Sequence, residues 1–284
     1  AGAMPQEVVD ALQHAWDRGL NFRPLVIAPD RKYSQPGAVR VLFYQRPAKQ
    51  FAEFERQEFV IPIVHLGALV MAILNQPDKL PQFASYQQTG MIRDLLVCTH
   101  GNYDVACSRF GYPIYQQLRK LDAMGDRFRV WRCSHFGGHE FAPTLIDLPI
   151  GQYWGHLEPN ILDRLIYRNG DVTALRSFYR GWAGLTKFEQ IAEREIWLQE
   201  GWKWLDYQKS GQVLAIDPSD EADPNWAVVQ IEFNSPDGSI NAAYEARIET
   251  KGTVQTMGTS GQNQSLEEVK QYRMSYLNKI DRGR

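Results

Sequence analysis

The sequence contains few cysteines, no long apolar run and almost no net charge. Its 284 residues include 31 lysines and arginines and 33 aspartates and glutamates, which gives a formal net charge of −2. Nucleic acids and anionic membrane surfaces attract strongly basic proteins, so this balance gives no sign of either partner. The longest apolar stretch, residues 61–74, is broken by Pro62, His65 and Gly67, whereas a membrane span needs roughly 18 apolar residues. We therefore expect no nucleic-acid partner and no membrane span.

The low cysteine count also indicates the kind of cellular compartment. Only Cys98, Cys107 and Cys133 occur, and a small, odd number argues against a disulfide scaffold and for a reducing environment. The N-terminal residues show neither the basic nor the apolar region of a secretory signal. We therefore expect a cytoplasmic protein. No G-x-G-x-x-G fingerprint occurs, so the sequence does not support a built-in nicotinamide or flavin site.

The first of three predicted regions, residues 1–90, alternates helix and strand as α/β regions do. Apolar periodicity predicts helices at residues 5–19 and 62–74 and strands at residues 23–28 and 38–44. Together with the regions that follow, this pattern predicts an α/β fold, α+β overall.

The second region, residues 91–210, has the order strand, helix, strand, loop, hairpin and helix, which matches a thioredoxin-like fold. The corresponding residues are 92–98, 113–121 with Pro113 in the first turn, 128–133, the loop with Gly137 and Gly138, 144–148 paired with 153–157, and 160–168. A capping box, Thr186-x-x-Glu189, then predicts a helix that runs to about residue 205.

The third region, residues 211–284, changes to a period of two after an acidic, proline-containing loop at residues 216–225. The predicted strands and turns are strands 226–233, 240–248 and 254–257, and turns 235–238 and 251–252. We expect a small antiparallel β-sheet here, and the sequence indicates no role for it.

Four residues of the second region form the pattern that carries chemistry: Cys98-x8-Cys107 followed by His135-x3-His139. Cys98 would end a buried strand, and Cys107 would lie in the loop just before the next helix, whose N-terminus favours a thiolate. The histidines follow the neighbouring strand, and the two glycines between them allow a sharp turn close to a bulky group. We therefore predict that the four side chains share one pocket.

Residue spacing leaves several kinds of site open. Two thiols and two imidazoles could bind zinc tetrahedrally, although the gap between the cysteines is longer than usual zinc spacing. A Cys98–Cys107 disulfide switch is a weaker alternative, because thioredoxin-type motifs have two intervening residues. A [2Fe–2S] site of the Rieske type also uses two cysteines and two histidines, but with a different spacing.

Neighbouring residues have open roles as well. Cys133 would share a strand face with His135 and could replace one of the two histidines, which would give three cysteine ligands and one histidine, although packing beside the site is the stronger interpretation. His100 could donate to a cluster sulfur or lie in a surface loop. Three arginines could offset the charge of a metal site or attract an acidic partner, although ordinary solvated side chains are slightly favoured: Arg93, Arg109 and Arg132.

The chain resembles the sucrase/ferredoxin-like family in three stretches, VCTHGNYDVACSRFGYPIY, RVWRCSHFGGHEFAPTLIDLPIGQYWGHL and FYRGWAGLTKFEQIAEREIW. The resemblance covers most of the chain and is strongest from residue 93 to residue 205. It implies a thioredoxin-like ferredoxin domain with a [2Fe–2S] cluster, held by Cys98 and Cys107 on one iron and by His135 and His139 on the other. Family members also have an early strand before the first helix, so we expect residues 1–90 to be a partial thioredoxin-like region.

The resemblance implies an electron-transfer protein that exchanges electrons with another protein, and an oxidoreductase component more than a hydrolase. Neutral imidazoles make such a cluster less negative than four thiolates do, which predicts a reduction potential above that of plant-type ferredoxins and coupled proton uptake. Two alternatives stay open: a redox enzyme whose cluster reduces a substrate, and a zinc-stabilised binding module. No carboxylate pair supports the glycosidase that the word sucrase suggests.

Overall fold

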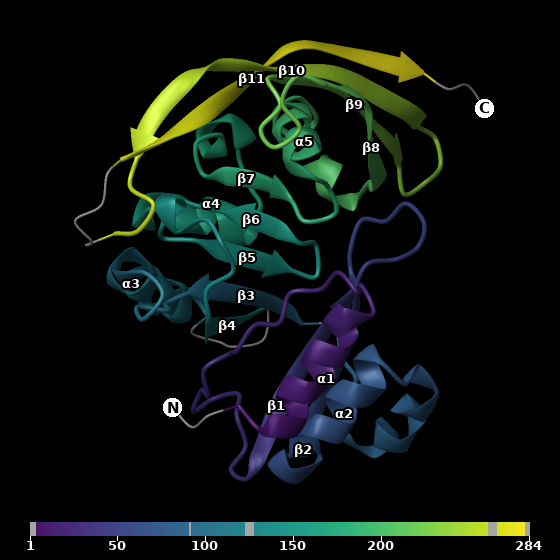
Figure 1. Cartoon of the computed structure of the whole chain (residues 1–284), viewed down its shortest axis with the longest axis vertical. Helices are drawn as coiled ribbons and strands as arrows, with labels where there is room; N and C mark the ends of the chain where they lie inside the picture. The colour runs from purple at the N-terminus through teal and green to yellow at the C-terminus, as the bar shows by residue number, and fades with distance from the viewer. Residues whose placement is uncertain (1–3, 91, 123–127, 261–265, 282–284) are drawn as a thin grey trace. The chain divides into compact units, whose positions relative to one another are not determined.

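The computed structural model describes residues 4–90, 92–122, 128–260 and 266–281. Within these ranges the chain forms helices and several sheets, which confirms the predicted mixed α/β class and the small C-terminal antiparallel sheet (Figure 1). The described residues form two compact units, the first with residues up to 45 and 55–90, the second with residues 46–54 and those from 92 onward. The predicted region boundaries near residues 90 and 210 stay predictions.

The first unit contains a two-stranded sheet and two helices. α1 (Gln6–Asp17) and α2 (Leu66–Leu74) confirm the predicted helices, and β1 (Ala38–Gln45) pairs antiparallel with β2 (Glu55–Pro62). Two short 3-10 helices are also present: Ile63–His65 and Pro77–Tyr86. The core of this unit contains the buried side chains of Phe59, Ile61 and Leu69.

Two features of the first unit differ from the predicted pattern. Residues 23–28 form no strand, and only Ile27 makes an isolated bridge, so that prediction was wrong. Pro24 contributes to this outcome because it has no backbone N–H to donate to a neighbouring strand. The sequence pattern also missed β2, because its first four residues, Glu-Arg-Gln-Glu, are all polar.

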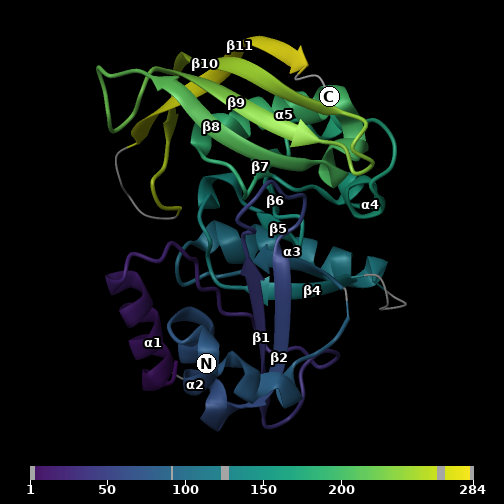
Figure 2. The ribbon, with the colours of Figure 1, turned by 90° about the vertical axis from the view of Figure 1, so that its right-hand side faces the viewer.

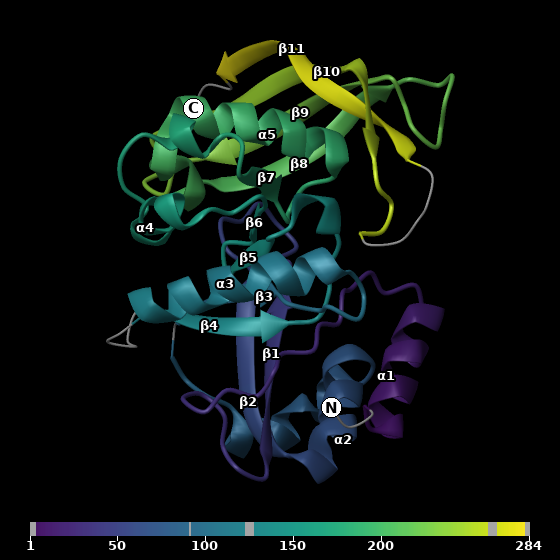
Figure 3. The ribbon, with the colours of Figure 1, turned by 90° about the vertical axis from the view of Figure 1, so that its left-hand side faces the viewer.

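The second unit is built around a five-stranded sheet in the order β4-β3-β5-β6-β7 (Figure 3). Its strands are β3 (Arg93–Cys98), β4 (Phe128–Cys133), β5 (Leu145–Leu148), β6 (Gln152–Trp154) and β7 (Tyr179–Trp182). β3 and β4 run parallel, and every other neighbouring pair is antiparallel. The apolar run at residues 95–97 is fully buried, as expected for a strand covered on both faces. The sequence pattern predicted the first four strands and missed β7.

α3 (Val105–Leu121) connects β3 to β4 and lies along them (Figure 3). It begins well before Pro113, where the sequence predicted its first turn, because the Asp104 carboxylate accepts a hydrogen bond from the Ala106 amide and caps the helix. Pro113 lies inside the helix and removes only one backbone hydrogen bond. α4 (Leu162–Tyr167) confirms the next predicted helix. Among the described residues, no helix is long and apolar enough to cross a membrane.

α5 (Lys187–Glu200) packs against one face of the C-terminal sheet (Figure 1). The predicted capping box is confirmed, because the Glu189 carboxylate accepts hydrogen bonds from the Thr186 amide and hydroxyl, each at 2.7 Å. α5 ends earlier than predicted, and a 3-10 helix, Gly201–Asp206, takes up the remaining residues.

The C-terminal sheet has four antiparallel strands in the order β11-β10-β9-β8 (Figure 2). They are β8 (Gln208–Ile216), β9 (Trp226–Asn234), β10 (Asn241–Thr256) and β11 (Glu267–Asp281). Every second residue of β9 is buried, which agrees with its predicted period of two. The predicted turn at Lys251-Gly252 was wrong: β10 continues through it with an irregularity in pairing, so residues 254–257 are no separate strand.

Candidate metal centre

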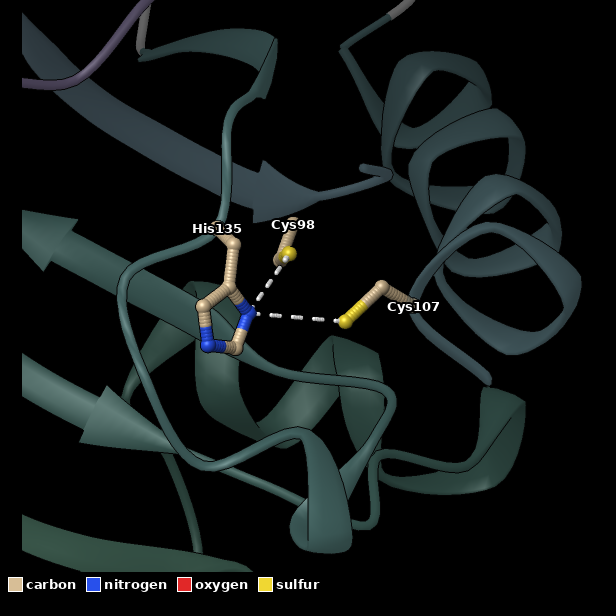
Figure 4. Close-up of side chains that lie close together, drawn as sticks. All are labelled: Cys98, Cys107 and His135. Carbon is tan, nitrogen blue, oxygen red and sulfur yellow. Dashed lines mark hydrogen bonds between the residues drawn. The ribbon is translucent and has the colours of Figure 1, made fainter. Parts of the chain in front are cut away.

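Three of the four predicted ligands lie together at one end of the central sheet (Figure 4). Cys98 is the last residue of β3, Cys107 lies in the first turn of α3, and His135 follows β4. His135 Nδ1 is 3.9 Å from Cys98 Sγ and 3.7 Å from Cys107 Sγ, and the three donor atoms all lie within 4.8 Å of one another. Cys107 was predicted in the loop before the helix, and that placement was wrong because the Asp104 cap starts the helix ahead of it.

Close packing of α3 on β3 brings the two thiols together. A side chain at Gly111 would place its Cβ only 2.1 Å from the backbone oxygen of Cys98, so only glycine allows this approach. Gly111 is one helical turn after Cys107, and the close contact therefore holds the first turn of α3 beside the end of β3. His135 arrives from the adjacent parallel strand, whose last residue, Cys133, is aligned with Cys98.

His139 is the fourth predicted ligand and lies beside the three-donor group. Its ring centroid is 5.4 Å from that of His135. Its Nε2 is 2.6 Å from the backbone oxygen of Gly258, which requires a proton on Nε2. Its Nδ1 is buried and makes no hydrogen bond, and the carboxylate of Glu140 lies 3.7 Å away. The tautomer that this arrangement favours leaves Nδ1 as the atom with a free lone pair.

Residues around His135 fix its position. The Tyr103 ring stacks on the imidazole, with centroids 3.8 Å apart and planes 12° apart. The Gly137 amide donates to His135 Nε2 at 3.1 Å. His100 uses its Nδ1 to accept the backbone N–H of His135 at 3.3 Å, so it supports the ligand loop.

The other residues with open roles lie outside the three-donor group. Cys133 is buried beside Cys98 on β4. Arg93 lies at the opposite end of β3 from Cys98 and makes two hydrogen bonds to the Asp147 carboxylate, so it does not offset charge at the site. Arg132 lies over the rings of two tyrosines of α3, Tyr112 and Tyr115.

The hydrogen bond between the two site thiols shifts their pKa values in opposite directions. A hydrogen bond with Cys107 lowers the pKa of Cys98 to about 6, opposed by burial and assisted by the His100 backbone and by His135. The same hydrogen bond, together with burial, raises the pKa of Cys107. Burial likewise raises the pKa of Cys133. Cys98 is therefore a thiolate near neutral pH, and the thiolate is the form of cysteine that binds metals.

A cavity of about 470 Å³ lies beside His139. Its lining includes Phe110 of α3, His156, and Met257 beyond the end of β10. Burial, together with the positive charge of Arg180, lowers the pKa of His156, so its imidazole is neutral at pH 7. The cavity therefore offers a partly apolar space next to a predicted ligand, with one acidic residue, Glu140, in its lining.

A family model described as sucrase/ferredoxin-like matches residues 5–181, which is more than half of the chain and includes all four predicted ligands. The chain belongs to the sucrase/ferredoxin-like family. No curated protein and no solved structure gave a match. The family match ends within β7, so α5 and the whole C-terminal sheet of this sucrase/ferredoxin-like protein lie beyond it.

Sequence reasoning missed three residues that contact the predicted ligands: Tyr103, Asp104 and Gly258. Asp104 had a usable signal, because an aspartate shortly before an apolar helical run is a typical N-cap. An exposed tyrosine such as Tyr103 carries no comparable signal. Gly258 is 119 residues beyond His139, and no local pattern links positions so far apart.

Proposed function

We propose that this protein transfers electrons with a [2Fe–2S] cluster bound by Cys98, Cys107, His135 and His139. The observation that carries the proposal is the three-donor group of two buried thiols and an imidazole nitrogen, in a member of a ferredoxin-like family. A second imidazole, that of His139, lies next to this group with an unbonded, buried Nδ1. Thiolate and imidazole are the two ligand types of histidine-containing [2Fe–2S] sites.

The donor set fits such a cluster in its surroundings as well as in its chemistry. A histidine that binds a metal usually donates its other ring N–H to a carbonyl or carboxylate, and the Nε2 of His139 has such an acceptor in Gly258. Helix N-termini favour negative charge, and Cys107 lies in the first turn of α3. The strand order β4-β3-β5-β6, with one parallel and two antiparallel pairs, supports the thioredoxin-like assignment of the domain.

The cluster would supply one-electron chemistry, and the protein side chains would set its potential. Two neutral imidazoles reduce the negative charge around the irons, so we expect a potential above the approximately −400 mV of plant-type ferredoxins. Burial of the thiols keeps water away from the cysteine side of the site. With no dinucleotide fingerprint in the sequence, we expect the electrons to come from a redox partner protein.

Proton uptake with the electron is expected at Nε2 of His135. Gly258 already holds a proton on Nε2 of His139, so that ring has no free site for another proton when Nδ1 is bound to metal. Nε2 of His135 accepts a hydrogen bond from the Gly137 amide, a contact that requires a deprotonated ring when Nδ1 is bound to metal, so reduction would restore the neutral imidazole by placing a proton on Nε2 as that contact opens. The potential should therefore fall with rising pH, and a potential that stays constant from pH 6 to pH 10 would contradict proton coupling.

The deciding experiment is iron, sulfide and zinc analysis of the purified protein, followed by EPR of the reduced protein with nitrogen hyperfine analysis. We expect a brown protein with two irons and two sulfides per chain and with two coordinated histidine nitrogens. A colourless protein with one zinc per chain would overturn the proposal. Hyperfine coupling to a single nitrogen would remove His139 from the ligand set.

Two sulfur–nitrogen distances favour the zinc alternative. Zinc binds sulfur at about 2.3 Å and nitrogen at about 2.0 Å, which puts the ligand atoms of a tetrahedral site about 3.5 Å apart. The sulfur–nitrogen distances of 3.9 and 3.7 Å at His135 are close to that value. The metal analysis described above separates this site from a [2Fe–2S] cluster directly.

The cavity beside His139 favours the redox-enzyme alternative. Its volume of about 470 Å³ lies within the range of about 300–1,000 Å³ that is usual for small-molecule sites. Steady oxidation of the reduced protein by a small molecule, with saturation, would support an enzyme. Oxidation only by partner proteins would support an electron carrier.

A further inference from the structure

The C-terminal sheet, for which the sequence indicated no role, reaches the candidate metal centre through one segment. This segment, residues 257–260, follows β10 and is called the strap below. The strap makes two short polar contacts with the site. The Gly258 oxygen is 2.6 Å from Nε2 of His139, and the Ser260 amide donates to the Asp104 carboxylate at 2.7 Å.

One contact is made with a predicted ligand, and the other is made with the residue that caps the helix of a second predicted ligand. His139 is itself a predicted ligand. Asp104 caps α3 by accepting the Ala106 amide on its other oxygen, and Cys107 lies in the turn that it caps. Only 2% of Asp104 is exposed, so the two amides replace most of the water that would otherwise solvate its charge.

The two contacts of the strap lie close together, beside Nε2 of His139. The Asp104 oxygen that binds the strap is 3.8 Å from Nε2 of His139, the same nitrogen that contacts the Gly258 oxygen. An acceptor and a negative charge beside Nε2 both favour a proton there, which leaves the lone pair on Nδ1. Without the strap, Nε2 would lose its acceptor, and the ring, which lines the cavity together with Met257 and Ser260, could rotate or change tautomer.

We infer that the strap is a positioning element for the metal site: Gly258 fixes the ring of His139, and Ser260 fixes the Asp104 cap beside Cys107. This inference rests on the proposed function, because it concerns how firmly the proposed ligands hold the metal. The strap lies beyond the family match, which ends at residue 181, so this feature belongs to the added C-terminal sheet. The sheet therefore acts at the site and does more than extend the core.

The main test removes one oxygen while keeping the cap. Asp104→Ser retains an oxygen that can accept the Ala106 amide but has no second oxygen for Ser260. Asp171→Ser is the matched control, since Asp171 caps a 3-10 helix, Val172–Leu175, through the Thr173 amide and makes no bond to the strap. A second variant, Ser260→Pro, removes both the amide and the hydroxyl that Ser260 offers to Asp104 and leaves Asp104 unchanged.

Two readouts are measured on the full chain. The first is the rate at which excess chelator removes the bound metal, followed by visible absorbance and metal analysis. The second is amide hydrogen exchange of the strap, which does not depend on bound metal. The EPR spectrum of each reduced variant provides a third signature, because a displaced His139 changes the nitrogen coupling.

We expect Asp104→Ser and Ser260→Pro to speed metal loss on the order of ten-fold, as changes to groups that orient metal ligands do. Exchange at residues 257–259 should also rise in both, and Asp171→Ser should match the unmodified protein. Faster exchange with an unchanged rate of metal loss would overturn the inference and leave the proposed function intact. An unmodified protein that binds no metal would overturn the proposed function and, with it, the positioning role.

Discussion

Two buried polar clusters of the second unit differ in what satisfies their side chains. In the cluster between α5 and the sheets, the Glu193 carboxylate accepts the Tyr179 hydroxyl at 3.1 Å and the Trp204 indole N–H at 2.9 Å. The Lys209 ammonium donates to two backbone carbonyls and lies over the rings of Trp182 and Trp204. Strong donors and acceptors within the chain therefore hold this cluster together, and both hydrogen bonds to Glu193 go to Oε1, whereas its Oε2 is buried and makes none.

At the candidate metal centre, the donor atoms face one another with weaker contacts. Both cysteine sulfurs lie 3.7–3.9 Å from one imidazole nitrogen, and Nδ1 of His139 has no hydrogen bond. Burial of polar groups is common to both clusters, so burial alone does not identify a site. The donor chemistry does, because thiolate and imidazole both bind transition metals, whereas indole N–H and ammonium groups are donors only and here pair with a carboxylate and with backbone carbonyls. Changes at Glu193 should therefore alter stability, and changes at the cysteines should alter metal binding.

The largest expected effect is the loss of metal from Cys98→Ser. A serine hydroxyl stays protonated at neutral pH and is a poor substitute for a thiolate ligand. Cys133→Ser is the matched control, because Cys133 is equally buried on the adjacent strand but lies outside the three-donor group. Metal content of the two purified variants measures the difference. Equal loss from both would indicate a site with three cysteine ligands.

Gly111→Ala should have the next largest effect, because the new Cβ would lie 2.1 Å from the backbone oxygen of Cys98. α3 must then move away from β3, which we expect to cost about 3 kcal/mol of unfolding free energy and to reduce metal content. Gln117→Ala is the control, since Gln117 is exposed on the same helix and its truncation adds no atom next to β3. Urea unfolding and metal analysis test both consequences. A variant with normal stability and normal metal content would show that α3 can shift without disturbing Cys107.

Glu193→Gln should change stability in a pH-dependent way and leave metal content unchanged. Burial raises the pKa of Glu193 to about 7, although Lys209 and the hydrogen bonds oppose this shift. A carboxyl whose pKa is raised in the folded state stabilises the fold below its unfolded pKa of about 4.5 and loses that contribution as pH rises through about 7. Glutamine cannot ionise, so the variant should match the unmodified protein near pH 5.

At pH 8 the same variant should be more stable than the unmodified protein, by about 2 kcal/mol after allowance for one unpaired amide N–H. Urea unfolding at both pH values measures this. A variant that is less stable at pH 8 than the unmodified protein would mean that the charged pair with Lys209 is favourable in the fold. Loss of metal from this variant would contradict the separation of the two clusters.

Local patterns predicted the parts of the fold that local physics determines. The alternation along β9 follows from one buried and one partly exposed face, and the Thr186–Glu189 capping box follows from unpaired amides at a helix start. The start of α3 was missed because Pro113 is a strong first-turn signal, whereas the Asp104 cap that starts the helix is weaker in sequence. β11 was missed because most of its residues are exposed and polar.

The candidate site could be predicted only in part, because local patterns show which residues are present but not which distant residues contact them. The clustering of cysteine and histidine in one stretch indicated which side chains to compare, and three of the four lie together. The contacts that orient them were beyond sequence reasoning. Gly111 acts through a close approach to Cys98, and Gly258 acts through a backbone oxygen, so neither reveals its role by residue type. Such contacts depend on the packed structure and not on any local pattern.

The smallest expected effect is that of Thr186→Ala, which removes the hydroxyl of the capping box at the start of α5. Loss of an N-cap typically costs about 1 kcal/mol, and Thr186→Ser, which keeps the hydroxyl, should cost much less. Because α5 carries Glu193 but no predicted metal ligand, the rate of metal loss should not change in either variant. Urea unfolding and chelator-driven metal loss measure the two quantities. Faster metal loss in Thr186→Ala would mean that α5 and the C-terminal sheet transmit strain to the strap, and the two clusters would then be coupled.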